Sequence, residues 1–281
     1  MKKRYWSLIV FVLPFVTCRM EFLSFRKNDD EQKTYIREKA GFNAQLLHYE
    51  SFGKKINYNK VGNDSLPLVV FVHGAPGSSS AFLDYLSDTS LLTHALLVAP
   101  DRPGYGYSDF GKAESRLQEQ SALLKPILEK HRRTKAILVG HSFGGPVIAK
   151  MAMDYPDLVD GLVIVAGSVD PVSEPETWWR RPLDWKILNW MLPPAFRVCN
   201  EEILPLKSEL VKMLPDWKNI TCPVTVIQGE TDELVPVENA HFLDQQLINS
   251  KNKNILILKN QGHFILWTRQ KLVVEEIKKL L

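Results

Sequence analysis

Short, continuously apolar stretches recur along the chain and alternate with longer stretches in which apolar residues return every three or four positions. The first pattern is typical of strands buried on both faces of a sheet, and the second indicates helices with one buried face. The patterns predict strands at residues 55–60, 68–72, 95–99, 136–139, 162–165, 224–227 and 255–258, and helices at 79–87, 113–133, 144–155, 237–249 and 264–281.

Strand and helix therefore alternate through most of residues 46–281, which we interpret as one domain. Strands connected by helices favour parallel pairing, because a helical crossover returns the chain to the same end of the sheet. The sequence predicts an α/β fold with a mostly parallel central sheet and helices on both faces.

Residues from about 170 to 217 interrupt the alternation. They hold seven of the 17 prolines and five of the seven tryptophans and contain no strand-like run, so we interpret them as a small helical cap insertion. Trp178, Trp179, Trp185 and Trp190 lie close together in this insertion, and we expect part of the cluster to line a pocket for an apolar ligand. The alternative is that these rings pack the cap against the main domain.

The amino terminus differs from the rest of the chain. Lys2, Lys3 and Arg4 precede an uncharged apolar run at residues 7–16, a pattern typical of a secretory signal and shorter than the ~20 residues that span a bilayer. Residues 1–18 are interpreted as a signal or a lipoprotein-type anchor ending at Cys18, and the polar residues 19–45 as a linker or a short helix that leads to the domain. We expect an exported protein, either membrane-anchored through Cys18 or periplasmic or extracellular. A cleaved signal without lipid, an uncleaved anchor and a segment packed on the domain remain alternatives.

Composition narrows the choice of function. The chain of 281 residues is 45% hydrophobic, which supports a large buried core and excludes a disordered chain. Its net charge of +3 and its single basic cluster, residues 125–133 on a predicted helix, give no support for a nucleic-acid partner. Apart from Cys18 only Cys199 and Cys222 remain, and we expect small buried residues rather than a disulfide, although export leaves a bridge open. The sequence says nothing about the oligomeric state.

The strongest candidate for chemistry is the serine in Gly140-His141-Ser142-Phe143-Gly144. It lies where a predicted strand turns into a predicted helix, which is the setting of a nucleophile elbow. Glycine two positions before and after the serine removes the clashes that a sharp turn would otherwise create. Ser142 is therefore the predicted nucleophile.

A serine hydroxyl needs an imidazole to take its proton and a carboxylate to orient that imidazole. Ligands gather at the carboxyl ends of parallel strands, and His263 and Asp232 follow the last two predicted strands. We predict Ser142, Asp232 and His263 as the catalytic residues, and Asp170 is the competing acid. No metal-binding or phosphate-binding motif is present, so neither a metal nor a cofactor is implied.

These residues resemble those of the α/β-hydrolase family, and the resemblance extends from about residue 50 to the end. The segment from His73 to Gly77 is similar to the oxyanion loop of the family, Asp101 to Ser108 to its D-R-P-G-x-G-x-S segment, and Gly229 to Val235 to its acid loop. The resemblance implies an oxyanion hole formed by the backbone N–H groups of Ala75 and Phe143. We expect His73 to be structural, and Asp101 and Arg102 to lock their loops through an ion pair.

Together these features predict a cofactor-free serine hydrolase, with small to medium apolar carboxylic esters as the preferred substrates. An acyltransferase, or a hydrolase of thioesters, lactones, amides or carbon–carbon bonds, would use the same three residues. A non-catalytic binding protein on the same scaffold is the remaining alternative. Serine at the elbow argues against epoxide hydrolase and haloalkane dehalogenase chemistry, because similar proteins with those activities carry aspartate there.

Overall fold

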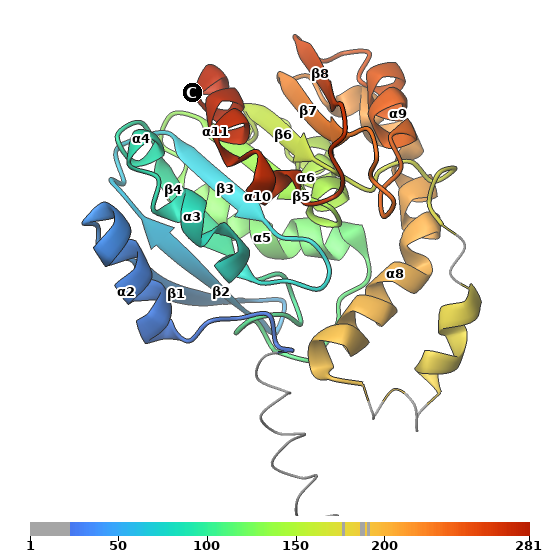
Figure 1. Cartoon of the computed structure of the whole chain (residues 1–281), viewed down its shortest axis with the longest axis horizontal. Helices are drawn as coiled ribbons and strands as arrows, with labels where there is room; N and C mark the ends of the chain where they lie inside the picture. Colours follow the sequence, from blue (N-terminus) through green and yellow to red (C-terminus); the bar gives the residue numbers. More distant parts are fainter. Residues whose placement is uncertain (1–22, 176–177, 186–188, 190–191) are drawn as a thin grey trace, which may run out of the picture.

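A computed structural model describes residues 23–175, 178–185, 189 and 192–281. Its centre is an eight-stranded sheet in the order β1-β2-β4-β3-β5-β6-β7-β8, in which β1, β2 and β4 pair antiparallel and every other neighbouring pair is parallel (Figure 1). This confirms the predicted α/β fold class. The strands are β1 (Gln45–Ser51), β2 (Lys54–Val61), β3 (Leu68–Val72), β4 (Leu96–Pro100), β5 (Ala136–His141), β6 (Gly161–Val165), β7 (Val224–Gly229) and β8 (Lys253–Leu258).

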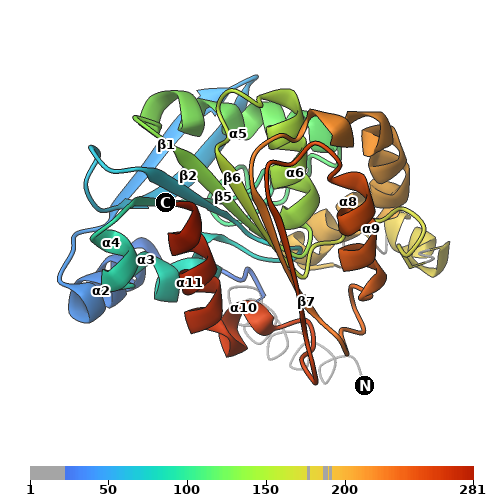
Figure 2. The same cartoon turned by 90° about the horizontal axis from the view of Figure 1, so that it is seen from above.

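Helices cover both faces of the sheet, as Figure 2 shows with the sheet seen nearly edge-on. Because side chains alternate along a strand, Leu68 and Val70 of β3 enter one apolar cluster, and Val69 and Phe71 enter the other. The first cluster is covered by α5 (Leu117–His131), α6 (Gly144–Asp154), α8 (Pro194–Met213) and α9 (Glu238–Gln246), and the second by α2 (Asp29–Ala40), α3 (Leu83–Leu86), α4 (Thr89–Leu92) and α11 (Gln270–Leu280).

The first strand, β1, was not predicted from the sequence. It lies at the edge of the sheet with its side chains partly exposed, so it lacks the apolar run that marks the buried strands. Phe52 and Gly53 both have positive φ, 49° and 70°, and join Ser51 to its partner Lys54 in a two-residue hairpin turn.

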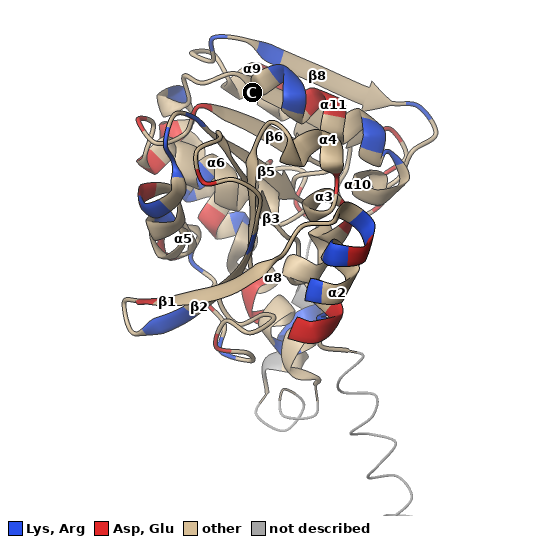
Figure 3. Ribbon diagram, turned by 90° about the vertical axis from the view of Figure 1, so that its left-hand side faces the viewer, with Lys and Arg blue, Asp and Glu red and all other residues tan. Residues whose placement is uncertain are grey.

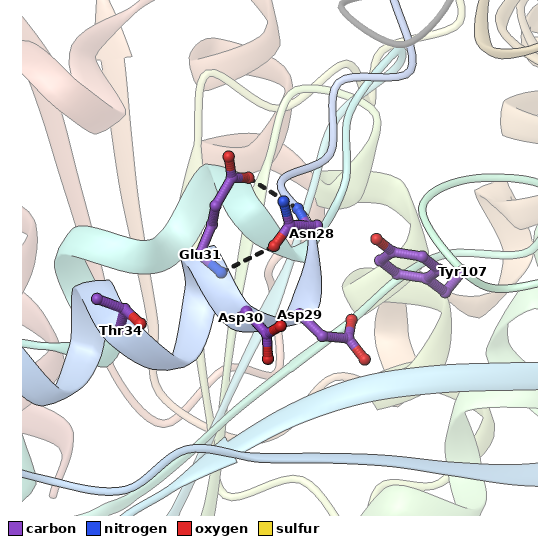
Figure 4. Close-up of a pocket in the computed structure, with 6 residues that line it drawn as sticks. All are labelled: Asn28, Asp29, Asp30, Glu31, Thr34 and Tyr107. Carbon is purple, nitrogen blue, oxygen red and sulfur yellow. Dashed lines mark hydrogen bonds between the residues drawn. The ribbon is translucent and has the colours of Figure 1, made fainter.

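The stretch interpreted as a linker, residues 19–45, contains helix α2, which packs on the domain. Asn28 caps this helix: its side chain accepts from the N–H of Glu31, and the Glu31 carboxylate accepts from the N–H of Asn28 (Figure 4). Figure 4 also shows that this capping box lines a surface pocket with Tyr107. Ile36 is 0% exposed in the core under the sheet, so the folded domain begins well before residue 46. Residues 19–45 thus contain a short helix, which was the alternative to a linker, and most residues of that helix are charged or polar.

The described residues of the connection between β6 and β7 form helical segments joined by turns and contain no strand, in agreement with the expected insertion. It contains the 3-10 segment η2 (Trp178–Asp184), helix α8 and the 3-10 segment η3 (Leu214–Asn219) (Figure 1). Cys199 of α8 and Cys222 are both free thiols, and burial raises their pKa values to about 11 and about 12. The disulfide that export left open is therefore not formed here.

Residues 1–18 lie outside the described residues, so the signal or anchor assigned to them stays a prediction. Of the helices that the structure describes, none is long and apolar enough to cross a membrane. In Figure 3, Lys and Arg alternate with Asp and Glu over the surface helices, and Lys125 and Arg132 in the basic cluster pair with Glu129 and Asp160. Two cations of the basic cluster therefore have carboxylate partners, and Arg133 is exposed to solvent.

Replacement of Ile36 by alanine tests whether α2 belongs to the folded domain. We expect Ile36→Ala to lower the free energy of unfolding by about 3 kcal/mol, because it removes buried methylene groups and leaves a cavity. Urea denaturation followed by tryptophan fluorescence measures the change. The control is Glu38→Ala, at an exposed position of the same helix. Equal free energies of unfolding for the two variants would mean that α2 does not contribute to the stability of the folded domain.

Candidate active site

The backbone at Ser142 is strained, and two glycines permit the strain. Ser142 has a φ of 54°, between the end of β5 and the start of α6. A Cβ atom on Gly144 would lie 2.1 Å from the carbonyl oxygen of Val72, and one on Gly140 would lie 2.4 Å from the carbonyl oxygen of Gly144. No side chain fits in either place, so the glycines are required by the close approach of three backbone segments. The turn leaves Ser142 partly exposed among buried neighbours.

Asp232 and His263, far apart in the sequence, are in direct contact. Nδ1 of His263 lies 2.9 Å from Oδ2 of Asp232, and the carboxylate also accepts from the backbone N–H groups of Leu234 and Val235 at 2.9 Å each. Burial works to raise the pKa of Asp232, but the hydrogen bonds from His263 and the backbone outweigh it and hold that pKa below its usual value. The ionised carboxylate can only accept, so Nδ1 of His263 carries a proton, and Nε2 is the acceptor of the neutral imidazole.

The loops that carry these two residues are joined through their backbones. The N–H of Thr231 donates to the carbonyl of Gln261 at 2.9 Å, and the Thr231 hydroxyl donates to the same oxygen at 3.0 Å. A Cβ atom on Gly229 would lie 2.4 Å from that carbonyl oxygen, so glycine at the end of β7 lets the loops approach. The loops of Asp232 and His263 are thus held together by hydrogen bonds between them.

His141 connects the serine to the histidine. It precedes Ser142 in the chain, its ring centroid lies 4.9 Å from that of His263, and its Nε2 lies 3.1 Å from the backbone carbonyl oxygen of His263. Burial, reinforced by the neighbouring His263, lowers the pKa of His141 to about 3. The neutral ring donates from Nε2 and holds the His263 loop beside the elbow.

The expected oxyanion residues also lie beside the elbow. A Cβ atom on Gly74 would lie 2.9 Å from Cβ of Ser142, so the loop that continues into Ala75 touches the serine. Phe143 is buried and directly precedes α6. Within the described residues, the N–H groups of Ala75 and Phe143 donate to no loop carbonyl or side chain. Two unpaired backbone donors therefore flank the serine.

His73 is structural, as expected. The N–H of Arg102 donates to Nε2 of His73 at 2.9 Å, so the proton is on Nδ1, which donates to the carbonyl of Gly74 at 2.7 Å. Burial and the nearby Arg102 charge lower the pKa of His73 well below its usual value, which keeps the ring neutral.

The ion pair expected between Asp101 and Arg102 is wrong. Asp101 accepts from the backbone N–H groups of Ser79 at 2.7 Å and Tyr107 at 2.8 Å. Arg102 instead pairs with Glu202 of α8, with Nη1 2.6 Å from Oε1. Adjacent residues on an extended strand end point to opposite sides, so Asp101 and Arg102 serve different partners.

Asp170 and Trp185 do not have the surroundings that their candidate roles require. Asp170 accepts from the N–H groups of Val172 and Ser173, at 2.9 Å and 3.2 Å, and closes its own turn at the start of the insertion. Trp185 is 68% exposed, which fits neither a pocket wall nor a packed core. Trp178 and Trp179 start η2, but their side chains and all of Trp190 lie outside the described residues. The pocket assigned to these rings stays a prediction.

Glu202 is the residue near the site that the sequence analysis missed. It is fully buried on α8, where Val198, Leu206 and Leu210 mark the inward face at helical spacing. An acidic residue on an otherwise apolar helix face is a recognisable indication of a buried partner. As to metals, the described residues hold no group of three or more His, Cys, Asp or Glu side chains placed to bind an ion.

Comparisons with known proteins bear on the fold and the family. The family model for the alpha/beta hydrolase fold matches residues 67–192. The chain is 25% identical to a protein phosphatase methylesterase of Candida albicans over 83% of this chain and 71% of that protein. It is 30% identical to a haloalkane dehalogenase of Bradyrhizobium diazoefficiens over 40% of this chain and 36% of that protein. A solved bacterial membrane phospholipase A superposes with a TM-score of 0.64 at 17% identity, over 99% of this chain and 97% of that chain.

The neutral, buried state of His141 predicts a dependence of stability on pH. Its pKa is about 3 in the folded protein and about 6.5 when unfolded, so below pH 6.5 the unfolded chain binds a proton that the folded protein does not. Stability therefore falls as the pH drops, by up to about 1.4 kcal/mol per pH unit from this residue. His141→Gln keeps a donor for the His263 carbonyl and should make the slope between pH 5.5 and 4 shallower by that amount.

Urea unfolding at pH 5.5, 5.0, 4.5 and 4.0 measures the slope. The control is His241→Gln, at an exposed position whose side chain meets water in both states. Identical slopes for wild type and His141→Gln would mean that the His141 ring takes up a proton without unfolding.

Proposed function

Because the chain belongs to the α/β-hydrolase fold family and is a hydrolase, we propose that it cleaves carboxylic esters by a cofactor-free route through an acyl-enzyme on Ser142. The observation that carries the proposal is the His263–Asp232 hydrogen bond beside a serine held at positive φ. A merely structural serine would not need the strained turn or the close approach of Gly140 and Gly144.

In the proposed reaction, Oγ of Ser142 attacks the ester carbonyl carbon while Nε2 of His263 takes the hydroxyl proton. The ionised Asp232 keeps the proton on Nδ1 and stabilises the imidazolium that forms. The N–H groups of Ala75 and Phe143 stabilise the negative oxygen of the tetrahedral intermediate. His263 then gives its proton to the departing alcohol as the carbon–oxygen bond breaks. Water, activated by the same imidazole, releases the acyl group as a carboxylic acid and restores Ser142.

An ester is the preferred substrate because its alcohol leaves readily and demands little of the acid His263. The Candida albicans relative is a methylesterase by name, which supports the same reaction class. We do not propose the activity of the dehalogenase relative for this chain, because Ser142 stands where similar dehalogenases carry aspartate. A small to medium apolar ester is the proposed substrate, with Phe143 and Ala75 as apolar neighbours of the nucleophile.

Covalent labelling tests the nucleophile. A fluorophosphonate forms a bond between its phosphorus and Oγ of an activated serine, fluoride leaves, and the hydroxyl proton passes to the histidine. We expect wild type to be labelled and Ser142→Ala to be unlabelled, with its ester hydrolysis reduced by about 10⁴-fold or more. The exposed control Ser65→Ala should label like wild type. Folded wild type that resists the reagent sinks the proposal.

A panel of 4-nitrophenyl esters from acetyl to long-chain acyl groups, with matched polar acyl groups, tests the substrate class. We expect the highest kcat/KM for short to medium apolar acyl groups, because apolar side chains flank the nucleophile. Equal or faster turnover of large polar esters contradicts this expectation. Product analysis with added alcohol separates the alternatives, since a transferase yields a new ester where a hydrolase yields the acid.

A further inference from the structure

One charged pair beside the site is completely enclosed. Arg102 and Glu202 have 0% exposed side chains, with Nη1 2.6 Å from Oε1 and Nη2 3.1 Å from Oε2. The carboxylate also accepts from the Tyr105 hydroxyl at 2.7 Å and from Nε2 of Gln120 at 2.8 Å. Each carboxylate oxygen therefore has two donors, which fixes the Arg102 fork in one orientation.

The edge of the guanidinium formed by Nε and Nη2 donates to the loop that touches Ser142. Nε of Arg102 donates to the carbonyl of His73 at 2.9 Å, and Nη2 donates to the carbonyl of Gly74 at 3.1 Å. The Gly74 oxygen also accepts from Nδ1 of His73 at 2.7 Å. Two donors, one of them cationic, thus hold a single carbonyl oxygen.

That carbonyl belongs to the same peptide unit as the N–H of Ala75. A trans peptide is planar, so its C=O and N–H point in opposite directions, and a fixed Gly74 oxygen fixes the direction of the Ala75 hydrogen. Donors at the carbonyl also draw electron density from the amide, which strengthens its N–H as a donor. The pair therefore controls both the aim and the strength of one proposed oxyanion donor.

We propose that Glu202 is a positioning residue for the reaction: through Arg102 it holds the Gly74–Ala75 peptide with its N–H directed at the oxyanion. This inference rests on the proposed function. Because Glu202 lies on α8, the insertion between β6 and β7 takes part in the chemistry as well as covering the sheet. The competing explanation is an ordinary structural ion pair.

The two explanations differ in what the pair does to the rate. A buried ion pair is a weak source of stability, and well-packed apolar replacements often fold as well as the original. If the pair is only structural, a folded variant without it keeps its activity. If it positions the oxyanion donor, the folded variant loses kcat, since the loss is confined to the transition state.

The first test is Glu202→Gln, which keeps the size of the side chain and removes the charge. We expect kcat for a 4-nitrophenyl ester to fall about 10-fold or more, with KM within about 2-fold, because displacing an oxyanion donor weakens transition-state binding and leaves substrate binding intact. The rate of fluorophosphonate labelling should fall by the same factor. The control, Arg132→Met, breaks the partly buried pair with Asp160 at the far end of β5 and should leave kcat unchanged.

A second variant separates folding from rate. Arg102→Met combined with Glu202→Leu and Tyr105→Phe replaces the polar cluster by apolar groups, and Gln120 keeps its bond to the carbonyl of Glu114 at 2.7 Å. We expect cooperative thermal unfolding near that of wild type, together with the same loss of kcat and labelling rate.

A folded variant of either kind with wild-type kcat or labelling rate overturns the inference. Failure of the proposed function gives a different result: wild type itself would not label. A labelled wild type beside an equally fast Glu202→Gln variant defeats the positioning role alone.

Discussion

The site depends on how closely three backbone segments approach one another at the carboxyl end of β5. Gly144 lies against the carbonyl of Val72 in β3, and Gly140 lies against the carbonyl of Gly144, at separations that exclude any side chain. This contact lets the chain reverse at Ser142 with positive φ and lift its hydroxyl above the sheet. The parallel registry of β3, β5 and β6 holds the turn from both sides, so the fold itself determines where the serine stands.

Among the titratable groups around that serine, Asp232 keeps its charge, whereas two buried histidines stay neutral. The pKa of Asp232 is held low by hydrogen bonds that outweigh its burial, so its charge is retained next to His263. His73 and His141 are buried with lowered pKa values and stay neutral; a ring N–H of His73 holds the carbonyl of Gly74 in its own loop, and one of His141 holds the carbonyl of His263 in another. One histidine is thus left with a lone pair free beside a carboxylate, while two others act as rigid supports.

Sequence patterns predict the parts of this protein that are governed by local rules. Continuous apolar runs predict the strands of the sheet. Ser142, Asp232 and His263 each follow such a run, at the carboxyl ends of β5, β7 and β8. Strand β1 was not predicted, and helix α2 was only one of two alternatives, because their polar residues face water and only a few residues, such as Ile36, enter the core. The partner of Arg102 escaped because proximity in sequence favoured Asp101, whereas the fold brings Glu202 from one hundred positions away. Long-range pairing of charges follows from packing, which no local pattern encodes.

Helix α8 packs its apolar side chains on one face of the sheet and also supplies the carboxylate that pairs with Arg102. Exchange of the insertion between relatives is an obvious route to altered selectivity, yet a transplanted segment that lacks an acid at position 202 would leave the Arg102 cation enclosed without a counter-ion. A chimaera with an exchanged insertion therefore needs a carboxylate at position 202 to pair with Arg102. The buried charge at position 202 thus adds an electrostatic requirement to the apolar packing that α8 already has to satisfy.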